Sequence, residues 1–455
     1  MGVTERLANF VVETTMAAVP SQVSTRAKEA MLDGLGCALV GSPTPSGKLM
    51  TQYVRQRSET PRASVIGSGF KTSAPLAALA NATLAHALDF DDVNWSMSGH
   101  PTVPLLPAVL ALGQELQAAG AAVLLAYILG FEVETKIGLG VNPRHYDLGW
   151  HATSTLGTLG AAAACAKLLG LDVERTRIAI GIAASSAAGL RQNFGTMTKP
   201  LHPGQAAMNG VTAAQLAQLG WTADLNILEA PYGFCQLYAG TDQDNFDHMV
   251  ERLGHPFELL ATGVAIKQYP CCAFTHRALD GVLALVQQHQ LRADAVVGVE
   301  CQVGRPTLEV LIHTRPRTGL EGKFSMQYCL AAALLDKRID LLSFSDEKVR
   351  RPAAQGFFER VTMRLHPDAQ PHGTSGEELP VLVAITLRDG RTVSTAVPHA
   401  KGHPANPLST IALQDKFEDC AYGVLERPDI RRVIKLVQDL EQVEDIGKLM
   451  DILMA

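Results

Sequence analysis

The chain has 455 residues, is 47% hydrophobic and only 18% charged, and carries a formal net charge of −6. This length suffices for one large hydrophobic core or two domains, and the thinly spread charge excludes an extended basic surface for nucleic acid. We therefore expect no nucleic-acid partner, and an anionic substrate would need a local cluster of Lys, Arg and His side chains.

The cysteines and the apolar runs indicate where the protein works. The 8 cysteines are scattered and form no CxxC motif, which predicts reduced thiols in a cytoplasmic protein. The first residues contain no long apolar run, so we expect no signal peptide. The longest apolar stretches, such as residues 121–131, are too short to span a bilayer, so we expect no membrane contact.

Apolar residues recur at helical spacing through most of residues 7–254. Gly and Pro punctuate these runs, and several runs are apolar nearly all round, which favours burial inside a bundle of helices. The predicted helices are residues 27–40, 74–88, 105–116, 122–137, 154–169, 175–190 and 206–219.

The pattern changes after about residue 264, where strands and helices mix. The predicted strands are 295–303, 307–313, 381–387 and 392–397, the last two joined by a turn at Asp389-Gly390, and the predicted helices are 275–289, 324–335, 408–425 and 429–440. We therefore predict a mainly α fold: a large all-helical domain from residues 1–265 and 400–455, and a smaller α/β (α+β) lid domain from residues 266–399.

The segment from His86 to Pro101 gathers three carboxylates and two imidazoles in a chain that is otherwise poor in charge. Charge in apolar surroundings is costly unless it is paired or used. If the helix continues to about Asn94, His86 and Asp89 share one face. His100 then stands at the entrance of the next helix, facing a pocket. The alternative is a solvated acidic helix end with a loop histidine.

Two further polar clusters lie beside predicted helices. His151 precedes a long apolar helix that Thr153 or Ser154 could cap, and a helix N-terminus favours anions. The alternative is a capped helix with a partly buried histidine. Lys199 and His202 lie in a Gly/Pro-rich loop between two helices, where ligand-binding groups are often presented. A surface lysine is the alternative there.

Two more clusters lie in the mixed region. Lys267 falls at the predicted domain boundary, where clefts favour small-molecule sites. Tyr328 is the second candidate here, with Arg305 nearby in sequence. A phenol can donate a hydrogen bond or a proton. A tyrosine buried in the core is the commoner explanation. No phosphate-binding loop, Rossmann glycine set or zinc spacing is present.

These motifs together resemble the MmgE/PrpD family. The matching segments are residues 86–92, 99–101, 149–153, 199–204, 269–272 and 323–325, followed by Tyr328. The family includes 2-methylcitrate dehydratase, cis-aconitate decarboxylase and iminodisuccinate epimerase. The resemblance implies a helical domain with a smaller lid domain, a homodimer, and catalysis without a metal or cofactor.

Motif by motif, the resemblance also implies the site. The implied catalytic residues are Asp89, His100, His151, Lys199, Lys267 and Tyr328, and our candidates for substrate binding are Tyr146, His202, Cys272 and Arg305. Family decarboxylases have a histidine where this chain has Cys272 and a threonine where it has Val93, and the spacing to His100 is one residue longer here. Residues 193–210 look especially similar to the epimerase branch.

The members share one kind of chemistry, proton transfer at a carbon next to a carboxylate of a small di- or tricarboxylate. We expect His100 and His151 to move protons, Asp89 to orient one of them, and Lys199 and Lys267 to stabilise the negative charge with help from Tyr328.

The first hypothesis is a metal-independent lyase of the 2-methylcitrate dehydratase kind. The alternative is an epimerase or isomerase of an aminated dicarboxylate such as iminodisuccinate. A cis-aconitate-type decarboxylase and a non-catalytic carboxylate-binding protein are weaker hypotheses.

Overall fold

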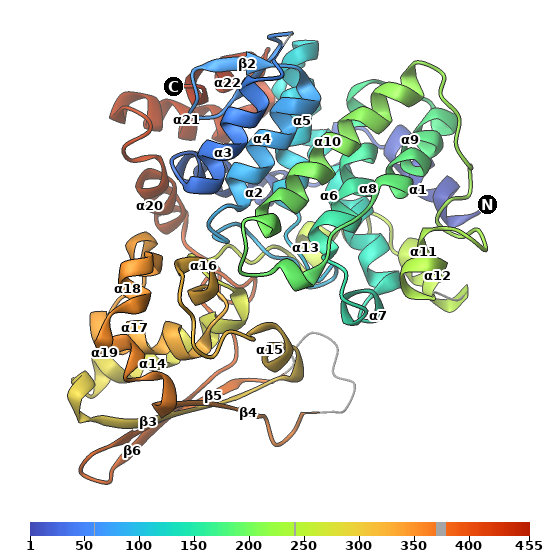
Figure 1. Cartoon of the computed structure of the whole chain (residues 1–455). Helices are drawn as coiled ribbons and strands as arrows, with labels where there is room; N and C mark the ends of the chain where they lie inside the picture. Colours follow the sequence, from blue (N-terminus) through green and yellow to red (C-terminus); the bar gives the residue numbers. More distant parts are fainter. Residues whose placement is uncertain (59, 241–242, 370–378) are drawn as a thin grey trace.

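The computed structural model describes residues 1–58, 60–240, 243–369 and 379–455. Its first half is a body of helices with a small hairpin of β1 (Ala63–Val65) and β2 (Phe70–Thr72) (Figure 1). The helices are α1 (Val3–Glu13), α2 (Ser21–Gly41), α3 (Pro45–Arg55), α4 (Ala74–His86), α5 (Thr102–Leu116), α6 (Gly120–Val141), α7 (Arg144–Asp147), α8 (Ala152–Leu168), α9 (Val173–Ser186), α10 (Thr198–Gln218), α11 (Phe234–Ala239), α12 (Gln243–Val250) and α13 (Glu258–Ala261).

The centre of this body is formed by α4, α5, α8 and α10, which pack against one another. Helix α8 is buried over almost its whole length, as its Ala- and Gly-rich sequence requires. Small residues let the backbones approach: a Cβ at Gly210 of α10 would collide with Ala161 of α8. The helices predicted from apolar spacing are therefore present, with ends that differ by several residues.

The second part of the chain forms a four-stranded sheet covered by helices, seen below the body in Figure 1. The strand order is β4-β3-β5-β6; β3 pairs parallel with β4 and antiparallel with β5, and β5 pairs antiparallel with β6. Its elements are β3 (Val296–Val303), β4 (Val361–Leu365), β5 (Val381–Leu387), β6 (Thr392–Val397), α14 (His276–Gln288), α15 (Arg305–Val310), α16 (Gly319–Gly322), α17 (Met326–Asp336), α18 (Asp346–Arg350) and α19 (Pro352–Gln355).

One predicted strand is wrong. Residues 307–313 were expected to extend, but Arg305–Val310 forms helix α15, with Pro306 in its first turn. Proline suits that position because its φ is already helical and it needs no hydrogen-bond donor there. The parallel neighbour of β3 is instead β4, which the sequence pattern did not reveal.

The last helices return to the helical body. They are α20 (Thr410–Ala421), α21 (Arg427–Gln438) and α22 (Gly447–Leu453). Phe417, Val433 and Leu449 belong to the same buried apolar cluster as Leu35 and Leu106. This packing supports a discontinuous helical domain, although its boundaries stay a prediction. The fold itself is mainly α with a smaller α/β part, as expected. Within the described ranges, no helix is long and apolar enough to cross a membrane.

Candidate active site

A cavity of about 470 Å³ opens between the helical body and the sheet-bearing part. The helical body contributes polar groups to its wall, and the second part contributes Cys272, Arg305 and Phe324. Of the predicted site residues, the wall includes Asp89, His100, His151, Lys199, Tyr146, Cys272 and Arg305. The structure therefore brings together groups that are far apart in sequence.

The backbone that carries Asp89 leaves the helix earlier than expected. Helix α4 ends at His86, and Asp89 has a φ of 52°, in the left-handed region. The prediction of a continuous helix to about Asn94 is therefore wrong.

Lysines from three distant segments explain this conformation. The Nζ atoms of Lys323, Lys267 and Lys416 donate to the carbonyls of residues 88, 89 and 90 at 2.8, 2.7 and 2.8 Å. Because each lysine satisfies a carbonyl that a longer helix would have bonded internally, the chain can turn here without leaving buried acceptors unpaired.

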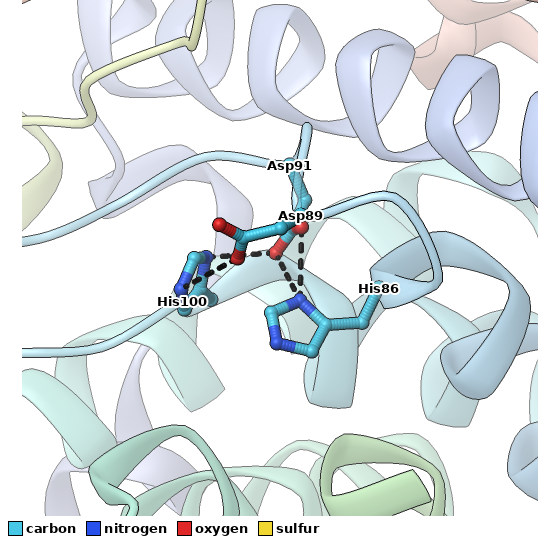
Figure 2. A group of neighbouring side chains, drawn as sticks. All are labelled: His86, Asp89, Asp91 and His100. Atoms are coloured by element: carbon cyan, nitrogen blue, oxygen red, sulfur yellow. Dashed lines mark hydrogen bonds and ion pairs between the residues drawn. The ribbon is translucent and has the colours of Figure 1, made fainter. Parts of the chain in front are cut away.

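Asp91 holds two histidines, as Figure 2 shows. Its carboxylate lies 2.9 Å from Nδ1 of His86 and 2.9 Å from Nδ1 of His100. On the far side of its ring, His86 Nε2 lies 2.7 Å from Nζ of Lys199. An ammonium can only donate, so His86 accepts at Nε2 and donates from Nδ1 to Asp91.

Neither His86 nor Asp91 was among the site residues predicted from the sequence, and the orienting role was expected of Asp89. The signal was present in the acidic segment, but a helical geometry would have placed Asp89, and not Asp91, beside His86.

Asp89 is paired with ammonium groups. Lys199 Nζ lies 2.6 Å from one carboxylate oxygen and Lys267 Nζ lies 3.2 Å from the other, while His100 Nε2 is 3.6 Å away. Burial alone would raise the pKa of Asp89, but Lys199, Lys267 and His100 together outweigh burial and hold this pKa well below its usual range. Asp89 is therefore a carboxylate that fixes two cations.

The cluster of His86, Asp89, Asp91 and His100 also has the donor types of a metal site, with ligand atoms within 4.8 Å of one another. However, both oxygens of Asp89 already face ammonium groups. A divalent cation here would have to displace two lysines or bear their repulsion at close range. The charges of this site therefore favour an anion next to Lys199, and not a metal ion.

His151 and His202 form a second buried imidazole pair, with their Nδ1 atoms 2.9 Å apart. His151 precedes α8 as its N-cap residue without a side-chain cap bond, so the expected capping by Thr153 or Ser154 is not found. Thr153 instead accepts from the backbone N–H of His100 at 3.0 Å, and Ser154 donates to the carbonyl of His202 at 3.1 Å. Both hydroxyls thus position histidines.

Lys199 and His202 lie in the first two turns of α10 and not in a loop as predicted. This placement aims the ammonium of Lys199 from a rigid element, near the end of a helix that carries partial positive charge. Lys267 stands behind Asp89, and neither Lys267 nor His202 is among the wall residues of the main cavity.

The imidazoles are held neutral. Burial is the main cause that lowers the pKa of His100, and Lys199 and Lys267 lower it further, although Asp91 opposes this shift. Burial and Lys199 hold the pKa of His151 well below its usual range. Burial and Asp89 raise the pKa of Cys272 to about 12, so its thiol stays protonated.

Tyr328 lies outside the wall of the described cavity. It is fully buried, its ring packs 5.8 Å from that of Phe344, and its hydroxyl donates to the carbonyl of Ser343. The structure therefore does not bring Tyr328 to the cavity wall with Lys199 and the other predicted site residues, and its expected catalytic role stays a prediction. Tyr146 does line the cavity, with the Arg191 guanidinium 3.9 Å from its ring centre, and Arg305 stands exposed at the wall.

The cavity between the helical body and the smaller sheet-bearing part is lined by ammonium and imidazole groups, which suit an anionic ligand. Residues 5–247 match the MmgE/PrpD N-terminal domain and residues 269–442 match the MmgE/PrpD C-terminal domain. The chain belongs to the MmgE/PrpD family, which confirms the resemblance seen in its motifs.

Curated relatives match over almost the whole chain. Cis-aconitate decarboxylase from Mus musculus is 31% identical over 98% of this chain and 92% of its own length. The human protein of that name is 30% identical over 99% of this chain and 94% of its own, and that of Aspergillus terreus is 27% identical over 99% and 96%. The family thus contains lyases that act on a carboxylate.

Proposed function

We propose that the chain is a lyase of the 2-methylcitrate dehydratase kind, acting on a small di- or tricarboxylate by proton abstraction next to a carboxylate. The observation that carries this proposal is that His100, which contacts Asp91, and Lys199, which is paired with Asp89, line one cavity. The first pair supplies a base and the second supplies a fixed cation for the charge that forms.

His100 is the proposed base. A neutral His100 that directs its Nδ1 proton toward Asp91 has a lone pair at Nε2. The lowered pKa keeps this nitrogen unprotonated at neutral pH. A proton next to a carboxylate is very weakly acidic, so the carbanion must be stabilised as it forms, and the Lys199 ammonium on the cavity wall meets that charge.

His151 is the proposed acid for the departing hydroxide. The ring centres of His100 and His151 are 6.5 Å apart and both line the cavity. Two groups at hydrogen-bond distance from a small reacting unit between them would be separated by about twice 3 Å. This spacing suits abstraction on one side and protonation on the other. The same arrangement suits epimerisation, which reprotonates the carbon on its opposite face.

Decarboxylation of cis-aconitate is the second candidate, because the relatives of that name match nearly the full chain. Two cavity-wall residues weigh against it. Val93 and Cys272 stand where family decarboxylases have a threonine and a histidine, so this wall has lost a hydroxyl and an imidazole. A thiol with a pKa of about 12 is a poor proton donor at neutral pH.

One experiment separates the candidates. The protein is incubated in deuterated water with 2-methylcitrate, iminodisuccinate or cis-aconitate, and NMR follows each reaction. An unsaturated tricarboxylate from 2-methylcitrate supports the proposal. Deuterium uptake without an alkene product indicates epimerisation, and loss of carbon dioxide from cis-aconitate indicates decarboxylation. Tight binding without turnover of any of them would leave a non-catalytic binding protein, and the variant His100→Asn is the control for background chemistry.

We further propose a homodimer in the cytoplasm, on the strength of the family resemblance and of the 8 cysteines. All of these cysteines fall in the described ranges and are buried free thiols. Sedimentation of the purified protein tests the dimer: a single species of twice the chain mass of 48.6 kDa is expected, and a monomer would contradict it.

A further inference from the structure

His202 is buried behind the cavity and has no part in the proposed reaction so far. It lies on α10, one turn after Lys199, and is 4% exposed. Its Nδ1 lies 2.9 Å from Nδ1 of His151, which is 1% exposed, and its backbone carbonyl is fixed by the hydroxyl of Ser154. The contact therefore belongs to a rigid pair of helices and not to a mobile loop.

The short Nδ1–Nδ1 distance restricts where protons can sit. Two imidazole nitrogens in hydrogen-bond contact share one proton, so two neutral rings must adopt complementary tautomers. If His202 donates, His151 carries its own proton on Nε2; if His151 donates, its Nε2 is a bare lone pair. The tautomer of His202 thus decides whether His151 offers an acid or a base.

The surroundings of His151 make a charged state costly. The titratable groups around it are Lys199, His202, His86 and His100, all of which are cationic or become so on protonation. The ring of Phe194 also lies against it, 4.9 Å away between centres. A proton gained or lost by His151 must therefore be compensated quickly.

The two outer nitrogens have different environments. Nε2 of His151 is fully buried and finds no hydrogen-bond partner among the described residues, although its ring lines the cavity. Nε2 of His202 makes no hydrogen bond within the described chain and is not one of its fully buried atoms, so a water molecule can contact it. This asymmetry gives the pair an inner end for substrate and an outer end for solvent.

We propose that His202 is a positioning residue that relays protons between solvent and His151, an inference that rests on the proposed function. His151 gives its Nε2 proton to the departing hydroxide, which leaves as water. The Nδ1 proton of His202 moves to Nδ1 of His151, and Nε2 of His202 takes one proton from solvent. Both rings are neutral before and after. Reversal of these steps, with cavity water as the inner donor, restores the starting tautomers.

The first test needs no substrate. The full chain is labelled with 15N-histidine, and the variants His151→Gln and His202→Asn assign the two rings. Complementary neutral tautomers at pH 7 are expected, and replacement of His202 should alter the tautomer signature of His151. Identical tautomers, or a protonated ring in either residue, would overturn the relay.

The second test distinguishes relay from simple orientation. His202→Asn keeps one hydrogen-bonding group near the Nδ1 position but has no outer nitrogen, while His202→Leu has neither. General acid–base catalysis contributes about 10²–10⁴-fold, so loss of the relay should lower kcat by about 10–100-fold in both variants, with KM within about twofold. A proton inventory in mixed light and heavy water should change from curved to linear.

Full activity of His202→Asn would show that His202 only orients His151 and would overturn the relay. The matched control is His145→Gln, a buried histidine that contacts Thr155 at 2.7 Å and lies outside the cavity wall. If the unmodified protein turns over none of the three carboxylates, the proposed function fails, and the tautomer measurement still decides the His151–His202 contact.

Discussion

Asp89 and Asp91 are separated by one residue but face opposite kinds of partner. Asp89 contacts two ammonium groups, whereas Asp91 contacts two imidazoles. Two residues apart on a regular strand would share a face, but the left-handed backbone at Asp89, with a φ of 52°, breaks that regularity and lets the two side chains meet different partners. One carboxylate therefore fixes charge, and the other sets the direction of a base.

This division predicts a pH effect. His100 must be unprotonated to act, so kcat/KM should fall as pH drops through its pKa, which lies below the ordinary 6.5. Asp91 raises this pKa, so Asp91→Asn should move the acid limb to still lower pH and reduce the plateau by about 10²-fold through lost orientation. The measurement is a pH profile of kcat/KM from pH 4 to 9.

Asp147→Asn, at the exposed wall of the cavity, is the matched control and should leave the acid limb in place. An unchanged limb in Asp91→Asn, or a limb that moves upward, would contradict the assignment of His100 as the base.

At this scale the sequence predicted residue types better than their partners. Seven of the ten candidate residues line the cavity. In a mostly apolar sequence, His, Lys and Asp side chains close to loops indicate a polar site. The pairings depend on contacts that span 235, 178 and 326 residues, between three lysines and successive carbonyls. No local pattern encodes such contacts, so neither the turn at Asp89 nor the role of Asp91 could be predicted.

At the scale of elements, α20 reaches the active-site loop from the far end of the chain. Lys416 lies 2.6 Å from Asp33 of α2 and donates to the carbonyl of Phe90. Both charged groups are buried, and burial raises the pKa of Asp33 while Lys416 opposes this. The pair thus ties two helices to the segment that positions Asp89 and Asp91.

Lys416→Met should lower the free energy of unfolding by about 3 kcal/mol, because it leaves a buried carboxyl without its cation. Urea denaturation measures the loss. The double variant Asp33→Asn, Lys416→Met should recover part of it, since no carboxyl is then stranded. A single variant as stable as the parent would show that the pair contributes nothing.

The contact of α4 with α10 predicts a second effect. Gly204 of α10 faces α4, and a Cβ there would lie 2.7 Å from the backbone carbonyl of Leu79. Gly204→Ala should push the helices apart, cost about 1–3 kcal/mol and lengthen the 2.7 Å contact of Lys199 with His86. The midpoint temperature of thermal unfolding and kcat should both fall. Gln205→Ala, on the exposed face of α10, should change neither quantity.

The elements themselves were largely predictable. Long amphipathic or apolar runs such as α6 and α8 have a clear helical period, and the β5–β6 hairpin has both alternation and an Asp-Gly turn. The short apolar run at 307–313 has neither a clear period nor a turn motif. Its helical form follows from Pro306 in the first turn and from β4, which takes the position beside β3.

Considered as a whole, the molecule builds its cavity from two packed cores, one made of helices and the other of a sheet with its covering helices. Arg305 lines the cavity from the sheet-bearing part and forms no ion pair within the described chain. Its guanidinium is therefore available to a substrate carboxylate.

Arg305→Gln should therefore raise KM by about tenfold and leave kcat within about threefold, because it binds substrate without touching the proton-transfer groups. Steady-state kinetics provides the measurement, with whichever of the three carboxylates reacts in the deuterated-water experiment. The reverse pattern, a large loss of kcat at constant KM, would place Arg305 in the chemistry itself.

The lysine at residue 416 also has a consequence for biosynthesis. A ribosome completes the first 260 residues, with most of the imidazoles and carboxylates of the site, long before it makes the residue that clamps the Phe90 carbonyl. A nascent or prematurely terminated chain lacks that clamp. If the proposed function holds, catalytic competence should therefore appear only when synthesis is almost finished.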